Sequence, residues 1–243
     1  DDTLSLTHVG GSLHRVPAGG GPSESLSEPE AGMQQMWVDA LPGAKGLLFT
    51  VGALGDPQRS EIAILSLEEG SVRPLFTGTM ARYADSGHIV YATSDFTLMA
   101  APFDLERLEA RGPAVPLIED VSVGVRSAAQ FALSPTGDLA YAARYLGSTA
   151  GVVRVARTGV AEEIDPSWRA PIVSLAISPD GTQLAVAIAR GASGTGNPVM
   201  TAQDLWIKRL DRGPLSRLTF EGSANFRPSW TADGRSVTYG SNR

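Results

Sequence analysis

The sequence predicts an all-β chain, and three observations support this prediction. A short turn phrase recurs at intervals of about 45 residues, with clear copies at Ser134–Gly137, Ser178–Gly181 and Thr231–Gly234. A run of apolar residues suited to a strand follows each copy, as at 184–188. No long segment keeps a helical period. A repeat of this length that is built from strands is typical of a β-propeller, in which each unit is a four-stranded antiparallel blade.

Three weaker copies of the turn phrase complete the series: Asp1–Thr3, Leu41–Gly43 and Asp85–Gly87. Sequences such as Pro-Asp-Gly form tight turns because Gly adopts positive φ without steric cost and Pro presets its own φ. We therefore place the phrase in the hairpin between the first and second strands of each unit. The third unit departs from the pattern, since Asp85-Ser86-Gly87 stands in place of Ser-Pro-Asp-Gly.

The unit around the 178–181 turn shows the predicted plan strand by strand. Its first strand is 172–177, and its second strand, 184–188, is apolar on both faces because neighbouring blades are expected to cover it. The third strand is 204–210, and a turn at Gly213-Pro214 leads into the fourth strand, 215–220. The same plan is repeated in the other units, with third strands at 62–67 and 152–155.

We expect a single propeller domain over residues 1–243. Its approximate units are 1–30, 31–77, 78–119, 120–165, 166–221 and a partial unit at 222–243. Such a chain has about five blades if its two ends pair, and pairing would protect open sheet edges. A second strand is present near both Leu4 and Val237, which is one strand too many for simple closure. An incomplete six-bladed propeller, or a fragment of a larger one, is therefore the alternative.

Composition excludes several classes of partner. The 243 residues suffice for a large core, and 42% apolar with 19% charged residues is typical of globular proteins. No apolar run is long enough for a membrane span, so we expect no direct membrane insertion. The net charge of -6 argues against nucleic acid as a partner. The absence of cysteine favours an extracytoplasmic location, periplasmic or cell-surface, with the cytoplasm as the alternative.

The sequence contains none of the common catalytic motifs. It has no G-x-S-x-G and no G-x-x-x-x-G-K-[ST], and the glycines of 191–196 have the wrong spacing for a dinucleotide site. His8, His14 and His88 lack the spacing of metal ligands. We therefore expect no catalytic residue, cofactor or metal in this chain. A kinase or peptidase domain could still be present elsewhere in a longer protein that contains it.

Loop length indicates where a binding surface lies. The loops 52–60, 119–128, 144–150 and 190–203 are long, whereas those on the opposite face are short except near 104–112, where 105–110 is interpreted as a widened hairpin loop. We expect polar and aromatic residues entering the innermost strands to line the channel mouth on the long-loop face. They are Gln35, Trp37, Arg82, Tyr83, Gln130, Trp168, Arg169, Asn225 and Arg227. Alternatively, they hydrogen-bond only channel water and neighbouring backbone.

The turn phrases and the segment Asn225–Trp230 resemble the TolB-like, WD-like propeller repeats of bacteria. The segments Gly11–Gly20 and Ala100–Leu108 look like the version appended to bacterial serine/threonine protein kinases. This resemblance covers nearly the whole chain and rests on turn and packing residues. It implies a non-enzymatic sensor or docking module of a larger bacterial protein, with a protein or peptide partner or a small ligand. The alternative is the noncatalytic propeller domain of a prolyl-oligopeptidase-like hydrolase.

Overall fold

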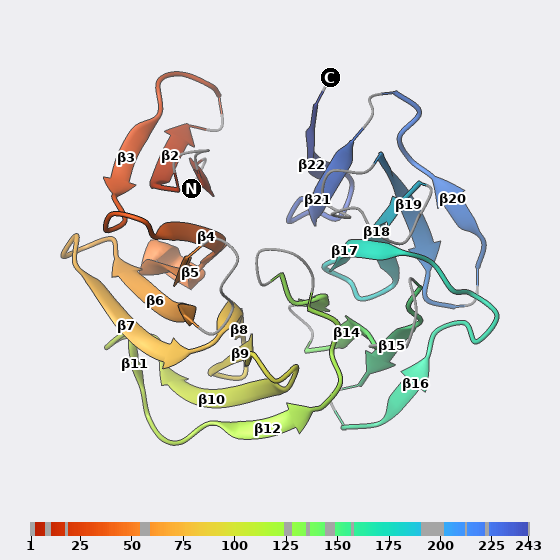
Figure 1. Cartoon of the computed structure of the whole chain (residues 1–243), viewed down its shortest axis with the longest axis horizontal. Helices are drawn as coiled ribbons and strands as arrows, with labels where there is room; N and C mark the ends of the chain where they lie inside the picture. The colour runs from red at the N-terminus through yellow and green to blue at the C-terminus, as the bar shows by residue number, and fades with distance from the viewer. Residues whose placement is uncertain are drawn as a thin grey trace. The chain divides into compact units, whose positions relative to one another are not determined.

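The chain forms antiparallel β-sheets that follow one another in sequence order, as seen in a computed structural model (Figure 1). The structure describes residues 3–7, 11–17, 19–53, 59–123, 128–134, 137–143, 149–156, 158–190, 202–211, 213–221 and 224–242. The chain divides into two compact units. Unit 1 comprises Asp1–Glu119 and Arg126–Ala129, and unit 2 comprises Asp120–Val125 and Gln130–Arg243.

Unit 1 contains three sheets in which each strand pairs with the next along the chain. The first sheet is β1 (Thr3–Thr7), β2 (Leu13–Pro17) and β3 (Glu24–Ser27). The second is β4 (Gln34–Ala40), β5 (Gly46–Gly52), β6 (Glu61–Ser66) and β7 (Val72–Thr77), with the short 3-10 turn η1 (Pro42–Ala44) between β4 and β5. The third is β8 (Thr79–Ala84), β9 (His88–Ala92), β10 (Leu98–Asp104), β11 (Glu109–Ala110) and β12 (Val115–Ile118). Both β11 and β12 pair with β10, so together they form an interrupted fourth strand.

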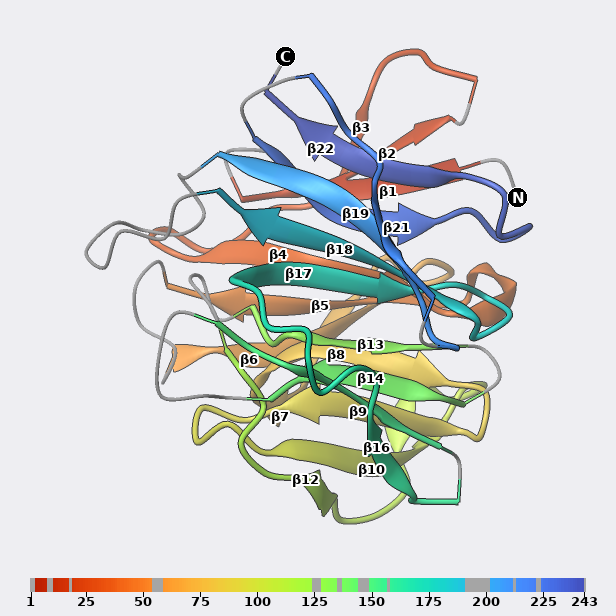
Figure 2. The same cartoon turned by 90° about the vertical axis from the view of Figure 1, so that its right-hand side faces the viewer.

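Unit 2 repeats this plan, and Figure 2 shows the strands β17, β18 and β19 lying side by side. Its first sheet is β13 (Phe131–Leu133), β14 (Leu139–Ala142), β15 (Val152–Val155) and β16 (Ala161–Glu163). Its second is β17 (Ile172–Ile177), β18 (Gln183–Ala189), β19 (Gln203–Arg209) and β20 (Leu215–Arg217). Its third is the pair β21 (Asn225–Trp230) and β22 (Val237–Ser241).

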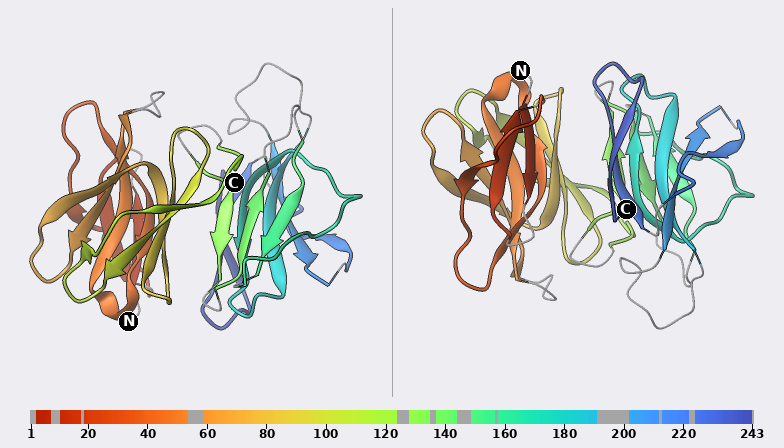
Figure 3. Two further views of the ribbon diagram at one scale, coloured as in Figure 1. Left: turned by 90° about the horizontal axis from the view of Figure 1, so that it is seen from below. Right: turned by 90° about the horizontal axis from the view of Figure 1, so that it is seen from above.

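These sheets confirm the predicted fold class. The sheets β4–β7, β8–β12, β13–β16 and β17–β20 are antiparallel meanders of the kind expected for propeller blades, and the sheets within each unit stack face to face (Figure 3). In the part of the chain that the structure describes, no helix has the length and apolar character that a membrane span requires.

The second strands are the most deeply buried, and the reason is that both of their faces are covered. On one face of β5, Leu48 packs with Ile89 of the β8–β12 sheet. On the other face, Leu47 and Phe49 pack with Leu13 of the β1–β3 sheet. All four of these leucine and phenylalanine side chains are at most 1% exposed. The apolar composition of the second strands therefore follows from stacking of the sheets.

The turn phrase is explained by hydrogen bonds within the turn itself. Ser178 Oγ donates to Asp180 Oδ1 at 2.6 Å, and Gly181, at φ +69°, donates its N–H to the Ser178 carbonyl at 2.9 Å. Thr231 and Asp233 make the corresponding side-chain bond at 2.6 Å. These bonds lower the pKa of both aspartates. The aspartates of the repeat therefore stabilise turns.

Candidate functional site

The nine predicted binding residues lie on or next to the first strands of the sheets. Unit 1 holds Gln35 and Trp37 on β4 and Arg82 and Tyr83 on β8. Unit 2 holds the other five, which lie just before β13 and β17 or on β21.

In unit 1, Asp39 joins two of the predicted residues. Asp39 Oδ1 lies 3.8 Å from Arg82 Nε, and Asp39 Oδ2 accepts the backbone N–H of Tyr83 at 3.0 Å. The side chains of Arg82 and Asp39 are 25% and 27% exposed. Burial raises the pKa of Asp39, while the charge of Arg82 and the N–H of Tyr83 act in the opposite direction. This half-buried ion pair connects β4 to β8 and leaves part of the guanidinium at the surface.

The sequence reasoning missed Asp39, although a signal for it is present. In the sheet registers, Asp39 pairs with Leu48 and Arg82 pairs with Val90, so the two occupy corresponding positions in neighbouring blades. The corresponding residue of β17 is Ala176, and that of β21 is Ser229. Alignment of the units against one another would have shown opposite charges at this position only in β4 and β8.

Trp37, Met80 and Arg227 share an unusual backbone conformation. Their φ angles are +58°, +53° and +53°, and the strand register shifts at each of them. The backbone N–H of Met80 donates to Thr50 Oγ1 at 2.9 Å, and that of Arg227 donates to Ser174 Oγ at 3.3 Å, in each case a hydroxyl of the preceding sheet. A bulge of this kind turns a side chain away from the ladder at a cost in backbone strain.

Gln35, Gln130 and Asn225 are buried, at 3%, 4% and 0% exposed. Gln35 Oε1 accepts the backbone N–H of Leu13 at 3.1 Å, and Asn225 Nδ2 donates to the carbonyl oxygen of Gln203 at 3.4 Å. Both bonds cross to the preceding sheet. The side chains of Gln35 and Asn225 therefore hold sheets together, and the burial of all three residues makes them unsuited to contact with a partner.

Trp168 and Arg169 belong to the connection between β16 and β17. Trp168 packs against the unit 2 core, and Lys208 Nζ lies 5.8 Å from the centre of its ring. The same ammonium lies 2.8 Å from Asp165 Oδ2. Arg169 Nη2 lies 2.8 Å from Glu163 Oε1. Both predicted residues therefore fix the path of this connection between two sheets.

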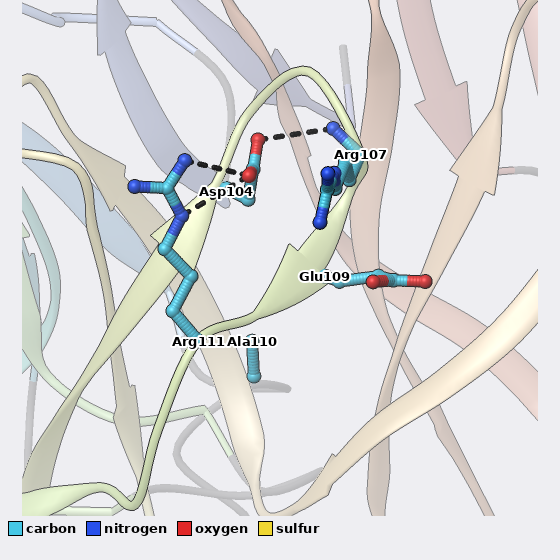
Figure 4. Close-up of a pocket in the computed structure, with 5 residues that line it drawn as sticks. All are labelled: Asp104, Arg107, Glu109, Ala110 and Arg111. Carbon is cyan, nitrogen blue, oxygen red and sulfur yellow. Dashed lines mark hydrogen bonds and ion pairs between the residues drawn. The ribbon is translucent and has the colours of Figure 1, made fainter.

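A polar hollow with a volume of about 510 Å³ lies at the hairpin between β10 and β11. The residues that line it are Asp104, Arg107, Glu109, Ala110 and Arg111 (Figure 4). The sequence predicts this segment as a widened hairpin loop, on the face opposite the expected binding surface. Most of the long loops of that surface, at 54–58, 124–127, 144–148 and 191–201, lie outside the described residues.

In the described part of the chain, no group of three or more His, Cys, Asp or Glu side chains could hold a metal ion.

Neither the protein-family models nor the curated proteins give a match to the sequence. Solved structures do match. TolB from Acinetobacter baumannii aligns with 97% of this chain at a TM-score of 0.67, with 14% sequence identity. The chain has the β-propeller fold of TolB. It spans 56% of the TolB chain, and the resemblance to TolB-like propeller repeats is supported at the level of the fold.

Enzymes share this TolB-like fold. Oligogalacturonate lyase from Vibrio parahaemolyticus has a TM-score of 0.56 and 15% identity, over 98% of this chain and 65% of the lyase. Puromycin hydrolase has a TM-score of 0.58 and 18% identity, over 92% of this chain and 37% of the hydrolase. Since proteins with different activities share one fold, these similarities support the fold of this chain and not an activity.

Proposed function

We propose that this TolB-like propeller is a non-catalytic module that binds a protein, peptide or small ligand through first-strand residues of its blades. The observation that carries the proposal is Trp37, a bulky residue at φ +58° on the strand that also holds Asp39 of the Asp39–Arg82 pair. Left-handed backbone at a bulky residue costs roughly 1–3 kcal/mol, and such strain is concentrated at functional sites.

The side chains at these positions suit recognition of a polypeptide. Tryptophan and arginine are the residues most enriched among those that dominate binding energy at protein interfaces. Arg82 is partly exposed beside Asp39, and in unit 2 the exposed Arg227 lies with its guanidinium 6.0 Å from the centre of the Phe226 ring. An aromatic face beside a guanidinium supports contact with apolar side chains and peptide carbonyls together.

We further propose that the module belongs to a larger bacterial protein, such as a serine/threonine kinase, and lies outside the cytoplasm. The segments Gly11–Gly20 and Ala100–Leu108 support the kinase context through their resemblance to kinase-associated repeats. The cysteine-free sequence is consistent with an oxidising compartment.

A pull-down from native bacterial extract, with the whole chain as bait, tests the proposal. Trp37→Gly removes the indole at a backbone position where Gly is unstrained, so the sheet should stay folded while partner recovery falls. The double variant Arg82→Ala with Arg227→Ala should also lower recovery. Two control variants should bind as the wild type does: Phe96→Gly, an aromatic at φ +71° in a turn, and Arg235→Gln, an exposed arginine. Equal recovery with every variant would rule out the first-strand surface.

A second candidate is the noncatalytic propeller domain of a prolyl-oligopeptidase-like hydrolase. The alignment of 92% of this chain with part of puromycin hydrolase favours it at the level of fold. The sequence encoded after Arg243 discriminates the two candidates. A G-x-S-x-G motif with downstream Asp and His would favour the hydrolase, whereas a kinase domain and membrane span before Asp1 would exclude it.

A further inference from the structure

We propose that the hollow at the β10–β11 hairpin is a binding site for a carboxylate, supplied by an acidic side chain of a peptide. The site uses residues of unit 1 that are separate from Trp37 and Arg82. Either site can therefore fail its test without affecting the other.

The hairpin is a rigid frame built around Asp104. Asp104 Oδ1 accepts the backbone N–H groups of Glu106 and Arg107 at 3.0 and 3.1 Å. Asp104 Oδ2 accepts two bonds from Arg111, from Nε at 3.0 Å and from Nη2 at 2.6 Å. Leu108, at φ +56°, places its side chain in the unit 1 core, where it is 6% exposed. The backbone of the hairpin and the Arg111 side chain are therefore held in place before any ligand binds, which lowers the entropy cost of binding.

The other two carboxylates of the hairpin are paired with cations of the β4–β7 sheet. Lys45 Nζ lies 2.6 Å from Glu106 Oε2. Arg73 Nη1 lies 3.4 Å from Glu109 Oε1, and Arg73 Nη2 donates to the carbonyl oxygen of Arg107 at 3.3 Å. Together with the pairing of Asp104, these contacts engage every acidic side chain of the hairpin with a cation.

Arg107 is the cation of this hairpin that pairs with none of these carboxylates. It is exposed, and its guanidinium makes no hydrogen bond or ion pair within the described parts of the chain. Figure 4 shows its side chain between Asp104 and Glu109 on the wall of the hollow. Arg111 places a second guanidinium on the same hollow with its side chain 66% exposed. A guanidinium binds a carboxylate through two parallel hydrogen bonds, and the second guanidinium adds to the local positive charge.

The lining of the hollow favours a single carboxylate over phosphate. Asp104 is paired with Arg111 and Glu109 with Arg73, so the charge of Arg107 is the one left unbalanced there. One carboxylate neutralises that charge, whereas a phosphate dianion would leave excess negative charge beside two carboxylates. A peptide backbone also brings N–H donors, which the free lone pairs of the Glu109 carboxylate can accept. The net charge of -6 opposes a highly acidic partner and is compatible with one isolated acidic residue.

An NMR titration of the whole chain at low ionic strength tests the site. The probe is the blocked peptide acetyl-Gly-Glu-Gly-amide, and the control peptide carries Gln in place of Glu. We expect saturable binding of the Glu peptide by the wild type and by Arg235→Gln, whose exposed arginine lies in the turn between β21 and β22. Arg107→Gln should raise Kd roughly tenfold, which corresponds to the loss of a charged hydrogen bond. The Gln peptide should not saturate either protein.

Several results would overturn the proposal. Equal Kd values for the wild type and Arg107→Gln would remove Arg107 from the site. Binding of inorganic phosphate as tightly as the Glu peptide would show a nonselective anion site, and equally tight binding of propionate would exclude a role for the peptide backbone. Failure of the Glu peptide to saturate the wild type would exclude the site. Circular dichroism checks that the Arg107→Gln protein is folded, which we expect because Arg107 is exposed.

Discussion

The ammonium of Lys208 lies 2.8 Å from Asp165 Oδ2 and 2.8 Å from the carbonyl oxygen of Gly213. Lys208 is on β19 and is 4% exposed, whereas Asp165 belongs to the connection that precedes β17. Hydrogen bonds from Lys208 and from Ser167 lower the pKa of Asp165 to about 2. This contact joins two sheets of unit 2 through one buried charge.

The two partners of this ion pair should respond differently to neutral substitution. Asp165→Asn leaves a buried ammonium with part of its partners, whereas Lys208→Met replaces that charge with an apolar side chain of similar length. We expect Asp165→Asn to destabilise the protein more than Lys208→Met. Urea unfolding of both variants at pH 7 measures the difference, and the reverse order would show that the buried ammonium without Asp165 costs less than the loss of the Lys208 interactions.

The same contact predicts how stability depends on acid. The folded pKa of Asp165, about 2, is below its ordinary value of 3.8, so the unfolded chain binds more protons between these values. The stabilisation is therefore complete above about pH 4 and is lost as the pH falls toward 2. Urea midpoints measured across this range should fall for the wild type and fall less for Lys208→Met. Parallel curves for the two proteins would show that Lys208 does not set this pKa.

Protonation of Asp39 should change the stability in the opposite direction from protonation of Asp165. Burial raises its pKa above the ordinary value of 3.8, so the folded protein takes up a proton at higher pH than the unfolded chain does. Acidification toward 3.8 then stabilises the fold through this residue. Asp39→Asn should abolish that contribution and, at pH 7, should leave the free energy of unfolding within about 1 kcal/mol of the wild type, because Asn still accepts the Tyr83 N–H. Measurements at pH 7 and at pH 4, just above the ordinary pKa of 3.8, test both parts.

If Asp39→Asn kept the full pH dependence of the wild type between these two values, the carboxyl would not be the titrating group. A loss of several kcal/mol at pH 7 would instead show that the ion pair with Arg82 outweighs the desolvation of Asp39.

The fold could be predicted from the sequence because its determinants are local. A Gly at positive φ sets turns such as those at Gly43 and Gly181, and burial on both faces sets the composition of the second strands, so β5 and β18 lie where the repeat predicts. The candidate site depends on contacts between sheets. The bulge at Met80 is held by a hydroxyl of Thr50, and Asp39 acquires its role only beside Arg82. The predicted hairpin loop at 105–110 is contacted by Arg73 of β7, a residue more than 30 positions earlier in the chain.

The left-handed backbone at Arg227 predicts a difference between two small substitutions. Arg227→Ala keeps a Cβ atom at φ +53°, whereas Arg227→Gly removes it and relieves the steric strain. Because the side chain is exposed, both variants lose little packing. We expect Arg227→Gly to be about 1 kcal/mol more stable than Arg227→Ala. Urea unfolding at pH 7 compares them, and lower stability of the glycine variant would show that chain entropy outweighs strain.

The buried position of Leu184 allows a prediction of what a charge between stacked sheets would do. It lies on β18, is 0% exposed and packs in the core that joins the β13–β16 and β17–β20 sheets. Its cross-strand partner Lys208 is already bonded to Asp165, so Leu184→Asp would bury a carboxylate whose nearest cation is engaged.

Leu184→Ala should cost about 2–5 kcal/mol through lost burial and cavity formation, and Leu184→Asp should cost more, enough to unfold unit 2. Tryptophan fluorescence is a suitable measurement because three of the four tryptophans are in unit 2, at Trp168, Trp206 and Trp230. The Leu184→Asp protein should show unfolded-like emission without urea, while Leu184→Ala should keep a transition at lower urea. A soluble Leu184→Asp protein with the wild-type transition would show that this side chain does not face the core, and the stacking of sheets in unit 2 would then need to be assigned differently.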